Sequence, residues 1–125
     1  MKQLLILTTF LSSLIMTSLA NAEWTKVYTG DGSSAYVNFD RLKKRDGKLY
    51  YWALIDLHSM KGQWSLTMYQ ETECKRDRFK VLNSTTYSDR MGSGDVIGSD
   101  NTPMNWTYPP PDSYGEAILY AVCDP

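Results

Sequence analysis

The sequence has 125 residues, of which 42% are hydrophobic and 22% are charged, and its formal net charge is -1 at pH 7. This length suits a single domain with a modest core. Nucleic-acid binding driven by bulk charge is excluded, because attraction to phosphates needs a concentrated excess of Lys and Arg. We therefore expect no nucleic-acid partner.

Residues 1–22 have the features of a secretory signal peptide. Lys2 precedes an uncharged apolar stretch, and the small-x-small pattern ANA ends at Ala22. The apolar stretch is shorter than the roughly 20 residues of a membrane-spanning helix, so we expect no membrane span. Cleavage is predicted after Ala22, which leaves residues 23–125 as one exported domain, periplasmic or secreted. No cysteine lies at the cleavage site, so no lipid anchor is predicted.

Short runs rich in β-branched and aromatic residues fill most of the remaining chain, separated by turn signals such as GDG and DG. The first two runs predict a hairpin. The third, residues 48–57, has apolar residues at both its odd-numbered and its even-numbered positions, which is typical of a strand covered on both faces. The predicted strands are residues 25–29, 34–39, 48–57, 63–75, 78–87 and 94–99.

The end of the chain predicts one short helix. Three consecutive prolines, residues 109–111, stop the preceding structure because proline can neither continue a helix nor enter a sheet interior. Ser113 and Glu116 form a capping-box pattern, in which each side chain satisfies a backbone N–H group at the helix start. The predicted apolar stripe of this helix consists of Tyr114, Ile118, Ala121 and Val122, with Leu119 widening it.

Cys74 and Cys123 are the only two cysteines of the sequence. In an oxidising compartment, two thiols in a small domain usually pair. A zinc site fits poorly, because His58 is the only histidine and neither cysteine has a second cysteine close by in the sequence. We therefore predict no metal site and a disulfide that contributes about 4 kcal/mol in the chain-entropy description. It would hold the helix, which is marginal alone in water, against the sheet face toward which Cys74 points.

Three blocks of the sequence resemble the surface-adhesin protein E family: YVNFDRLKKRDGKLYYWALIDL, ETECKRDRFKVLNSTTYSDRMGSGDVIGS and NWTYPPPDSYGEAILYAVC. The resemblance covers about residues 28–123 and implies an adhesin domain. It also implies an α+β fold with a six-stranded antiparallel sheet and a C-terminal helix tied to one face by a disulfide, which agrees with the patterns above. Three features depart from the family: Asn38 stands in place of Asp, Asp112 stands in place of Gly, and the lipid-attachment cysteine of surface-exposed members is missing.

Patterns for catalysis are weak. Asp56 and His58 would need a serine to form a triad, and no nucleophile elbow marks any serine, so a solvated loop explains His58 better. Glu71 and Glu73 have the spacing of an acid and base pair on one strand face, but a solvated face explains them better. We predict no enzyme, no catalytic residues and no cofactor.

Two basic clusters are the better candidates for function, although solvated turns are the simpler explanation of both. We expect Trp52 in the core, while Trp106 is open to either a core or a binding role. The expected partner is a protein or an acidic polysaccharide, and an exposed edge strand could form a homodimer. The first cluster consists of Arg41, Lys43, Lys44 and Arg45, and the second of Lys75, Arg76, Arg78 and Lys80.

Two hypotheses of function follow. The first is adhesion to host or extracellular macromolecules, which the family resemblance implies. The second is a periplasmic accessory or inhibitor domain that acts on another envelope protein, because small disulfide-tied sheets suit such a role. Localisation separates the two, since an adhesin must reach the cell surface or be released.

Overall fold

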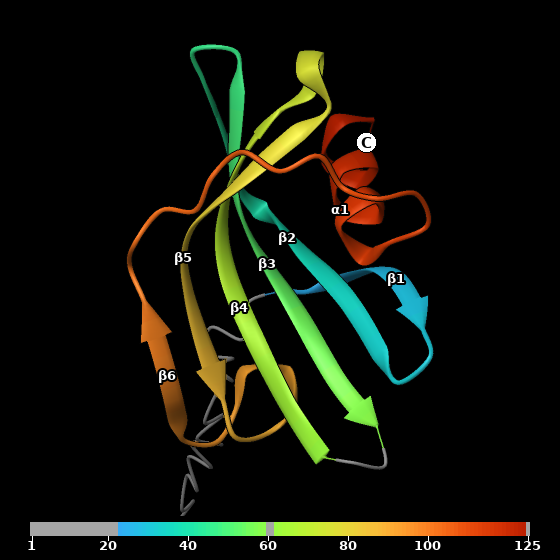
Figure 1. Ribbon diagram of the computed structural model, residues 1–125, viewed down its shortest axis with the longest axis vertical. Coiled ribbons are helices and arrows are strands. Elements are labelled where there is room, and N and C mark those ends of the chain that lie inside the picture. The colour runs from blue at the N-terminus through green and yellow to red at the C-terminus, as the bar shows by residue number, and fades with distance from the viewer. Residues whose placement is uncertain (1–22, 60–61, 125) are drawn as a thin grey trace, which may run out of the picture.

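The computed structural model describes residues 23–59 and 62–124, which form an antiparallel sheet in sequence order with a C-terminal helix (Figure 1). The predicted α+β fold is confirmed. The predicted signal peptide, residues 1–22, lies outside the described residues. The elements are β1 (Thr25–Gly30), β2 (Ser33–Arg45), β3 (Lys48–Ser59), β4 (Gly62–Glu73), η1 (Cys74–Arg76), β5 (Arg78–Tyr87), η2 (Arg90–Gly92), β6 (Val96–Asp100) and α1 (Tyr114–Cys123), where η denotes a 3-10 helix.

Strand β2 is longer than predicted and irregular near its middle. It continues past Phe39 to Arg45, and its register against β3 shifts between Asn38 and Lys43. Within this shift the Asn38 side chain accepts a hydrogen bond of 3.0 Å from the backbone N–H of Asp40. A local bond of this kind satisfies a backbone group that the ladder leaves unpaired. The first basic cluster therefore lies on an irregular strand, and its placement in a turn was wrong because the shift breaks the period-2 pattern.

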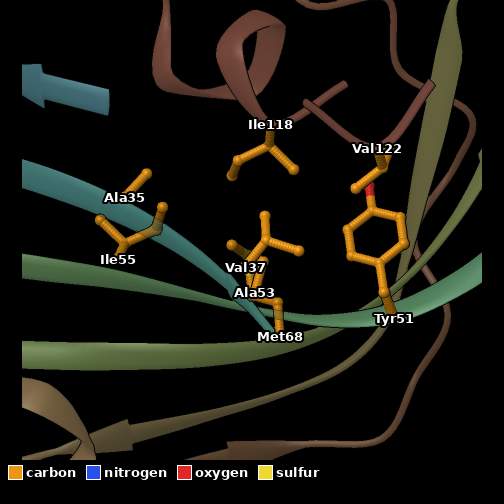
Figure 2. Close-up of a cluster of buried hydrophobic side chains, with 8 residues drawn as sticks. All are labelled: Ala35, Val37, Tyr51, Ala53, Ile55, Met68, Ile118 and Val122. Atoms are coloured by element: carbon orange, nitrogen blue, oxygen red, sulfur yellow. The ribbon is translucent and has the colours of Figure 1, made fainter. Parts of the chain in front are cut away.

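One face of the sheet packs against α1 and forms the core (Figure 2). The largest buried side chain in this layer is Tyr51, whose ring points from β3 toward Val122 of the helix. Its hydroxyl donates to Gln70 Oε1 at 2.9 Å and lies 2.6 Å from Thr72 Oγ1, because a buried hydroxyl needs a partner. Burial raises the pKa of Tyr51. The core cluster consists of Ala35, Val37, Tyr51, Ala53, Ile55, Met68, Ile118 and Val122.

The N-terminus of α1 is capped by Ser113, whose Oγ accepts a 3.2 Å hydrogen bond from the backbone N–H of Glu116. The Glu116 carboxylate makes the return contact, but it accepts from the backbone N–H of Asp112 at 3.1 Å rather than from that of Ser113. The return bond therefore reaches one residue further back than in a capping box. It still satisfies a backbone donor just before the helix.

The buried stripe of α1 differs from the prediction at Tyr114 and at Ala121, which is only half-buried. Tyr114 is 45% exposed and meets Tyr28 edge-on, with 6.5 Å between the ring centroids, so its place in the stripe was wrong. Gly115 is the buried residue of the first turn. A Cβ atom there would lie 3.3 Å from Pro109 Cβ and 3.5 Å from a ring carbon of Phe79. The helix begins too close to these side chains for a larger residue to face inward.

The disulfide between Cys74 and Cys123 is confirmed, with 5.7 Å between the Cα atoms. It joins the start of η1, directly after β4, to the last residue of α1. The two cysteines are 49 residues apart in sequence, so the bond closes a long loop that contains β5 and β6. The helix is thereby attached to the sheet at its own C-terminal end.

The opposite face of the sheet is partly covered by η2. Asp56 on this face is fully buried, and it accepts hydrogen bonds from Arg90 Nη2 at 2.7 Å, Arg90 Nε at 2.9 Å and the backbone N–H of Met91 at 2.8 Å. Leu54 beside it is also fully buried, with Gly92 of η2 packed close to it. This part of β3 is therefore covered on both faces, as its sequence predicts.

Candidate binding surface

Aromatic side chains form a row on the sheet face that α1 leaves uncovered. Tyr50 and Trp52 of β3 point to this face, because successive side chains of a strand alternate between faces. Tyr69 of β4 is the register partner of Trp52 and lies between the two, with ring centroids 5.0 Å from Trp52 and 6.4 Å from Tyr50. Cross-strand aromatic contacts of this kind stabilise a sheet, and all three rings remain partly exposed on this face.

Trp106 reaches the same face from the segment between β6 and α1. The neighbouring residue Thr107 exchanges two backbone hydrogen bonds with Phe79 of β5, at 3.0 and 2.8 Å. The backbone N–H of Met104 also donates to the carbonyl of Val81 at 2.8 Å. These bonds attach the segment to the first half of β5, beside the place where β6 pairs with its second half. The position of Trp106 is therefore fixed by backbone pairing.

Three cationic side chains surround the ring of Trp106. Arg78 Cζ lies 4.3 Å from the ring centroid, Lys80 Nζ 4.5 Å and Lys48 Nζ 5.7 Å. A cation near an aromatic face is attracted by the ring quadrupole. Next to this group, Arg45 Cζ lies 4.6 Å from the centroid of Tyr50. We refer to the whole set as the cationic band, which consists of Arg45, Lys48, Tyr50, Tyr69, Arg78, Lys80 and Trp106.

Two carboxylates lie among these cations. Glu71 accepts a 3.1 Å hydrogen bond from the Tyr50 hydroxyl and lies 3.4 Å from Lys48 Nζ. Glu73 accepts a 2.7 Å hydrogen bond from Arg78 Nε, and this bond holds the pKa of Glu73 below its usual value. The expectation of a solvated face was wrong for Glu71, which is only 7% exposed. Both carboxylates neutralise and orient neighbouring cations.

Positive charge nevertheless predominates in the cationic band. Arg45 and Lys80 form no ion pair with any residue in the described ranges, whereas Lys48 and Arg78 do. The band therefore has four cations against two carboxylates, and the nearer carboxylate to Lys80 is that of Glu71, its register partner. An acidic ligand could contact Arg45 and Lys80 without first breaking an ion pair.

The structure divides the first predicted basic cluster between the two faces of the sheet. Lys44 pairs with Leu49, which packs against the helix-side core. Lys43 pairs with Tyr50 on the opposite face, where Arg45 also lies. Directly paired residues of neighbouring strands share a face, so adjacent members of this cluster serve different surfaces.

The second predicted cluster is divided as well. Arg78 and Lys80 belong to the cationic band, while Lys75 and Arg76 are exposed residues of η1. Arg76 Nε lies 3.7 Å from the carboxylate of Glu73. Lys48 and Tyr50 were not predicted as members of the surface, although they lie four and two residues from Trp52 on the same strand and therefore share its face. The position of Trp106 depends on a bridge between distant segments, for which the sequence carries no signal.

A groove of about 190 Å³ opens on the same sheet face, next to the cationic band. Trp52 lines it and is half-buried, so its expected place in the core was wrong. Arg41, the remaining member of the first basic cluster, contributes from the irregular part of β2. The groove is lined by Trp24, Asn38, Arg41, Trp52, Thr67 and Tyr87.

The residues considered for a catalytic triad have other contacts. Asp56 is bonded to Arg90 and to the Met91 backbone, and no described hydrogen bond joins it to His58. His58 Nε2 lies 3.4 Å from Ser34 Oγ, a long contact for a hydrogen bond. Asp56 holds η2 on the sheet, whereas His58 lies on β3 and is half-buried, so its expected place in a solvated loop was wrong.

Strand β6 forms one edge of the sheet (Figure 1). Its five residues are all exposed, including the apolar Val96 and Ile97. An exposed apolar edge is a template for pairing with another strand. A homodimer through such an edge stays a prediction. Within residues 23–59 and 62–124, no helix is long and apolar enough to cross a membrane.

Fold and surface together define a small α+β domain, tied by a disulfide, with one sheet face covered by a helix and the other carrying the cationic band. The family model for surface-adhesin protein E matches residues 24–124, and the chain belongs to this family. Because the family is one of surface adhesins, membership implies an exported protein.

Solved structures of Haemophilus influenzae protein E have the same fold. Its crystal form II is 12% identical with a TM-score of 0.57, covering 78% of this chain and 91% of that chain. The selenomethionine form is 11% identical with a TM-score of 0.56, covering 78% of this chain and 89% of that chain. At this identity the likeness shows the fold alone. No curated protein matches the chain.

Proposed function

We propose that this protein is a non-catalytic adhesin domain that binds an acidic macromolecule of the host or its extracellular surroundings through the cationic band. The observation that carries the proposal is the convergence of Lys48, Arg78 and Lys80 around the ring of Trp106. Membership in the surface-adhesin family supports adhesion as the biological role. The partner is a protein or a polysaccharide that carries many carboxylate or sulfate groups.

The physical basis of this binding is charge together with aromatic contact. Arg and Trp are enriched at the residues that dominate binding energy in protein interfaces. The excess of positive charge on the cationic band, where Arg45 and Lys80 form no ion pair with described residues, attracts an acidic partner and speeds its association. Exposed charge interactions are screened over about 8 Å at physiological ionic strength, so binding must weaken as salt rises.

Adjacent residues of β2 provide a matched pair of variants. Lys44 and Arg45 are both exposed cations of the same cluster, but only Arg45 lies on the cationic band. We expect Arg45→Glu, and more strongly Lys80→Glu, to weaken binding to immobilised heparin, with Lys80→Glu costing about tenfold or more. Lys44→Glu changes the net charge equally and should leave binding nearly unchanged.

Poly-glutamate as a second immobilised ligand distinguishes a general preference for carboxylates from a preference for acidic polysaccharides. The proposal fails if wild-type protein shows no salt-sensitive binding to either polymer, or if Lys44→Glu weakens binding as much as Lys80→Glu does. Surface labelling of intact cells tests the adhesin role itself. Protein found only in the periplasm would favour the accessory or inhibitor domain instead.

A further inference from the structure

The groove beside the cationic band has the size and lining of a site for one small ring. Its volume of about 190 Å³ lies below the roughly 300–1,000 Å³ of sites for drug-sized ligands. Trp24, Trp52 and Tyr87 supply flat apolar surfaces, while Asn38 and Arg41 supply polar groups. Pockets that combine aromatic walls with a few polar groups fix both the face and the orientation of a ligand.

Asn38 provides a hydrogen-bond donor to this groove. Its side chain is almost fully buried at 3% exposure, and its Oδ1 accepts the backbone N–H of Asp40. A backbone N–H can donate only to the oxygen of the side-chain amide, not to its nitrogen. The Nδ2 group of Asn38 therefore points away from the Asp40 backbone. No described residue accepts a hydrogen bond from Nδ2. Among the described residues, every side-chain nitrogen that is fully enclosed has a hydrogen-bond partner, so Nδ2 cannot be fully enclosed. The Nδ2 group is therefore open to the groove that Asn38 lines.

Arg41 provides a positive charge at the same groove. Its side chain forms no ion pair with any described residue. Arg41 lies in the part of β2 between Asn38 and Lys43, where the register with β3 shifts. Its backbone therefore has no register partner on β3. A guanidinium group matches the two oxygens of a carboxylate with two parallel hydrogen bonds. The groove thus joins a carboxylate-binding group, an amide donor and aromatic walls.

We propose that the groove binds a single hexuronate ring, with its carboxylate on Arg41, a hydroxyl on the Asn38 amide and its C–H face against Trp52. The choice of a sugar acid over other small carboxylates rests on the proposed function. Trp52 also contacts Tyr69 of the cationic band, so an acidic polysaccharide could place one ring in the groove and continue over the band. Binding of the monosaccharide tests the groove separately from the band.

Ligand-observed saturation-transfer NMR with the exported protein tests this site, using D-glucuronate as the probe. D-Glucose is the matched neutral ring, and acetate is a carboxylate without a ring. We expect saturable transfer to glucuronate at millimolar concentrations, about tenfold weaker binding of glucose, and no binding of acetate. No binding of glucuronate, or equal binding of glucuronate and glucose, would overturn the proposal.

Two variants change the chemistry of the groove. Arg41→Gln removes the charge of an exposed side chain and should abolish the preference for glucuronate over glucose. Asn38→Asp keeps an oxygen for the Asp40 backbone but replaces the open donor with a charge that repels the ligand, so it should abolish glucuronate binding. Lys44→Gln, on the other face of the sheet, is the control. Unchanged glucuronate binding in Arg41→Gln would also overturn the proposal.

The groove and the band can fail independently. Binding of heparin without binding of glucuronate would overturn the hexuronate site and leave the proposed function standing. Binding of glucuronate without salt-sensitive binding of any acidic polymer would support the site and overturn the proposed function. Lys80→Glu should weaken heparin binding while leaving glucuronate binding unchanged.

Discussion

The guanidinium group of Arg78 lies over the ring of Trp106, with 4.3 Å between Cζ and the ring centroid. The same group donates a 2.7 Å hydrogen bond from Nε to Glu73. Arginine can stack on a ring and pair with a carboxylate at the same time, because its guanidinium is planar and delocalised. Arg78 is thus held between Glu73 and Trp106, and the cationic band is ordered before any ligand arrives.

Removing the ring at the centre of the band should reduce binding more than stability. We expect Trp106→Leu to lower affinity for immobilised heparin about tenfold, since Lys48 and Lys80 lose the surface that orders them. Trp64→Leu is the control, because Trp64 is exposed and makes no cation contact with the described residues. Thermal melts of both variants should stay close to wild type. Equal binding losses in the two variants would contradict the role given to Trp106.

The contact between Glu73 and Arg78 predicts a pH dependence of stability. The Arg78 hydrogen bond holds the pKa of Glu73 below its unfolded value of 4.5. A lowered folded-state pKa stabilises the fold above the unfolded pKa, and this contribution is lost as pH falls through the folded pKa. Glu73→Gln should therefore flatten the fall of the melting temperature below about pH 4.5. A variant curve parallel to wild type throughout acidic pH would show that this pair contributes nothing.

The buried carboxylate of Asp56 should make Arg90 important for stability. Arg90→Ala would leave Asp56 with only the Met91 N–H as a partner in a fully buried site. We expect a clear loss of stability in urea unfolding, because the fully buried carboxylate of Asp56 would keep its charge with a single hydrogen-bond donor. Arg76→Ala, which removes an exposed cation, should cost well under 1 kcal/mol. Similar losses in both variants would refute this assignment.

The disulfide should account for a large part of the stability. Replacing both Cys74 and Cys123 with serine is expected to lower the free energy of unfolding by about 4 kcal/mol, since the open chain regains loop entropy. Limited proteolysis should then cut near α1 first, because this short helix depends on its attachment. Free-thiol titration of unfolded, non-reduced wild-type protein checks the bond directly. Two reactive thiols in that titration would disprove it.

Local patterns in the sequence were sufficient to predict most of the strands, the helix and the disulfide. The alternation of 63–75 placed Cys74 on the face that packs against α1, and the serine before Tyr114 located the helix start. These features depend on residues that are close in sequence. The strands also follow one another in space, so each neighbour in the sheet is a neighbour in the chain.

The candidate surface could not be predicted in the same way. Trp106 meets Lys48 and Lys80 only because Thr107 pairs with Phe79, a contact between distant segments. Arg41 reaches the groove only because β2 loses its register after Asn38. Neither the bridge between Thr107 and Phe79 nor the register shift of β2 produces a periodic pattern of residues in the sequence. Adjacent basic residues of the first cluster divide between two faces of the sheet for a different reason: β2 continues to Arg45, and successive side chains of a strand alternate between faces.

The most direct test of the cationic band is to map an acidic ligand onto the protein by NMR. Isotope-labelled protein is titrated with a short heparin oligosaccharide, and the backbone amide and indole N–H resonances are followed. The largest shifts are expected at the Trp106 indole and at the amides of Arg78 and Lys80, with little change along α1. Shifts concentrated on α1 or β6, or no shifts at all, would contradict the proposal that this face of the sheet is the adhesive surface.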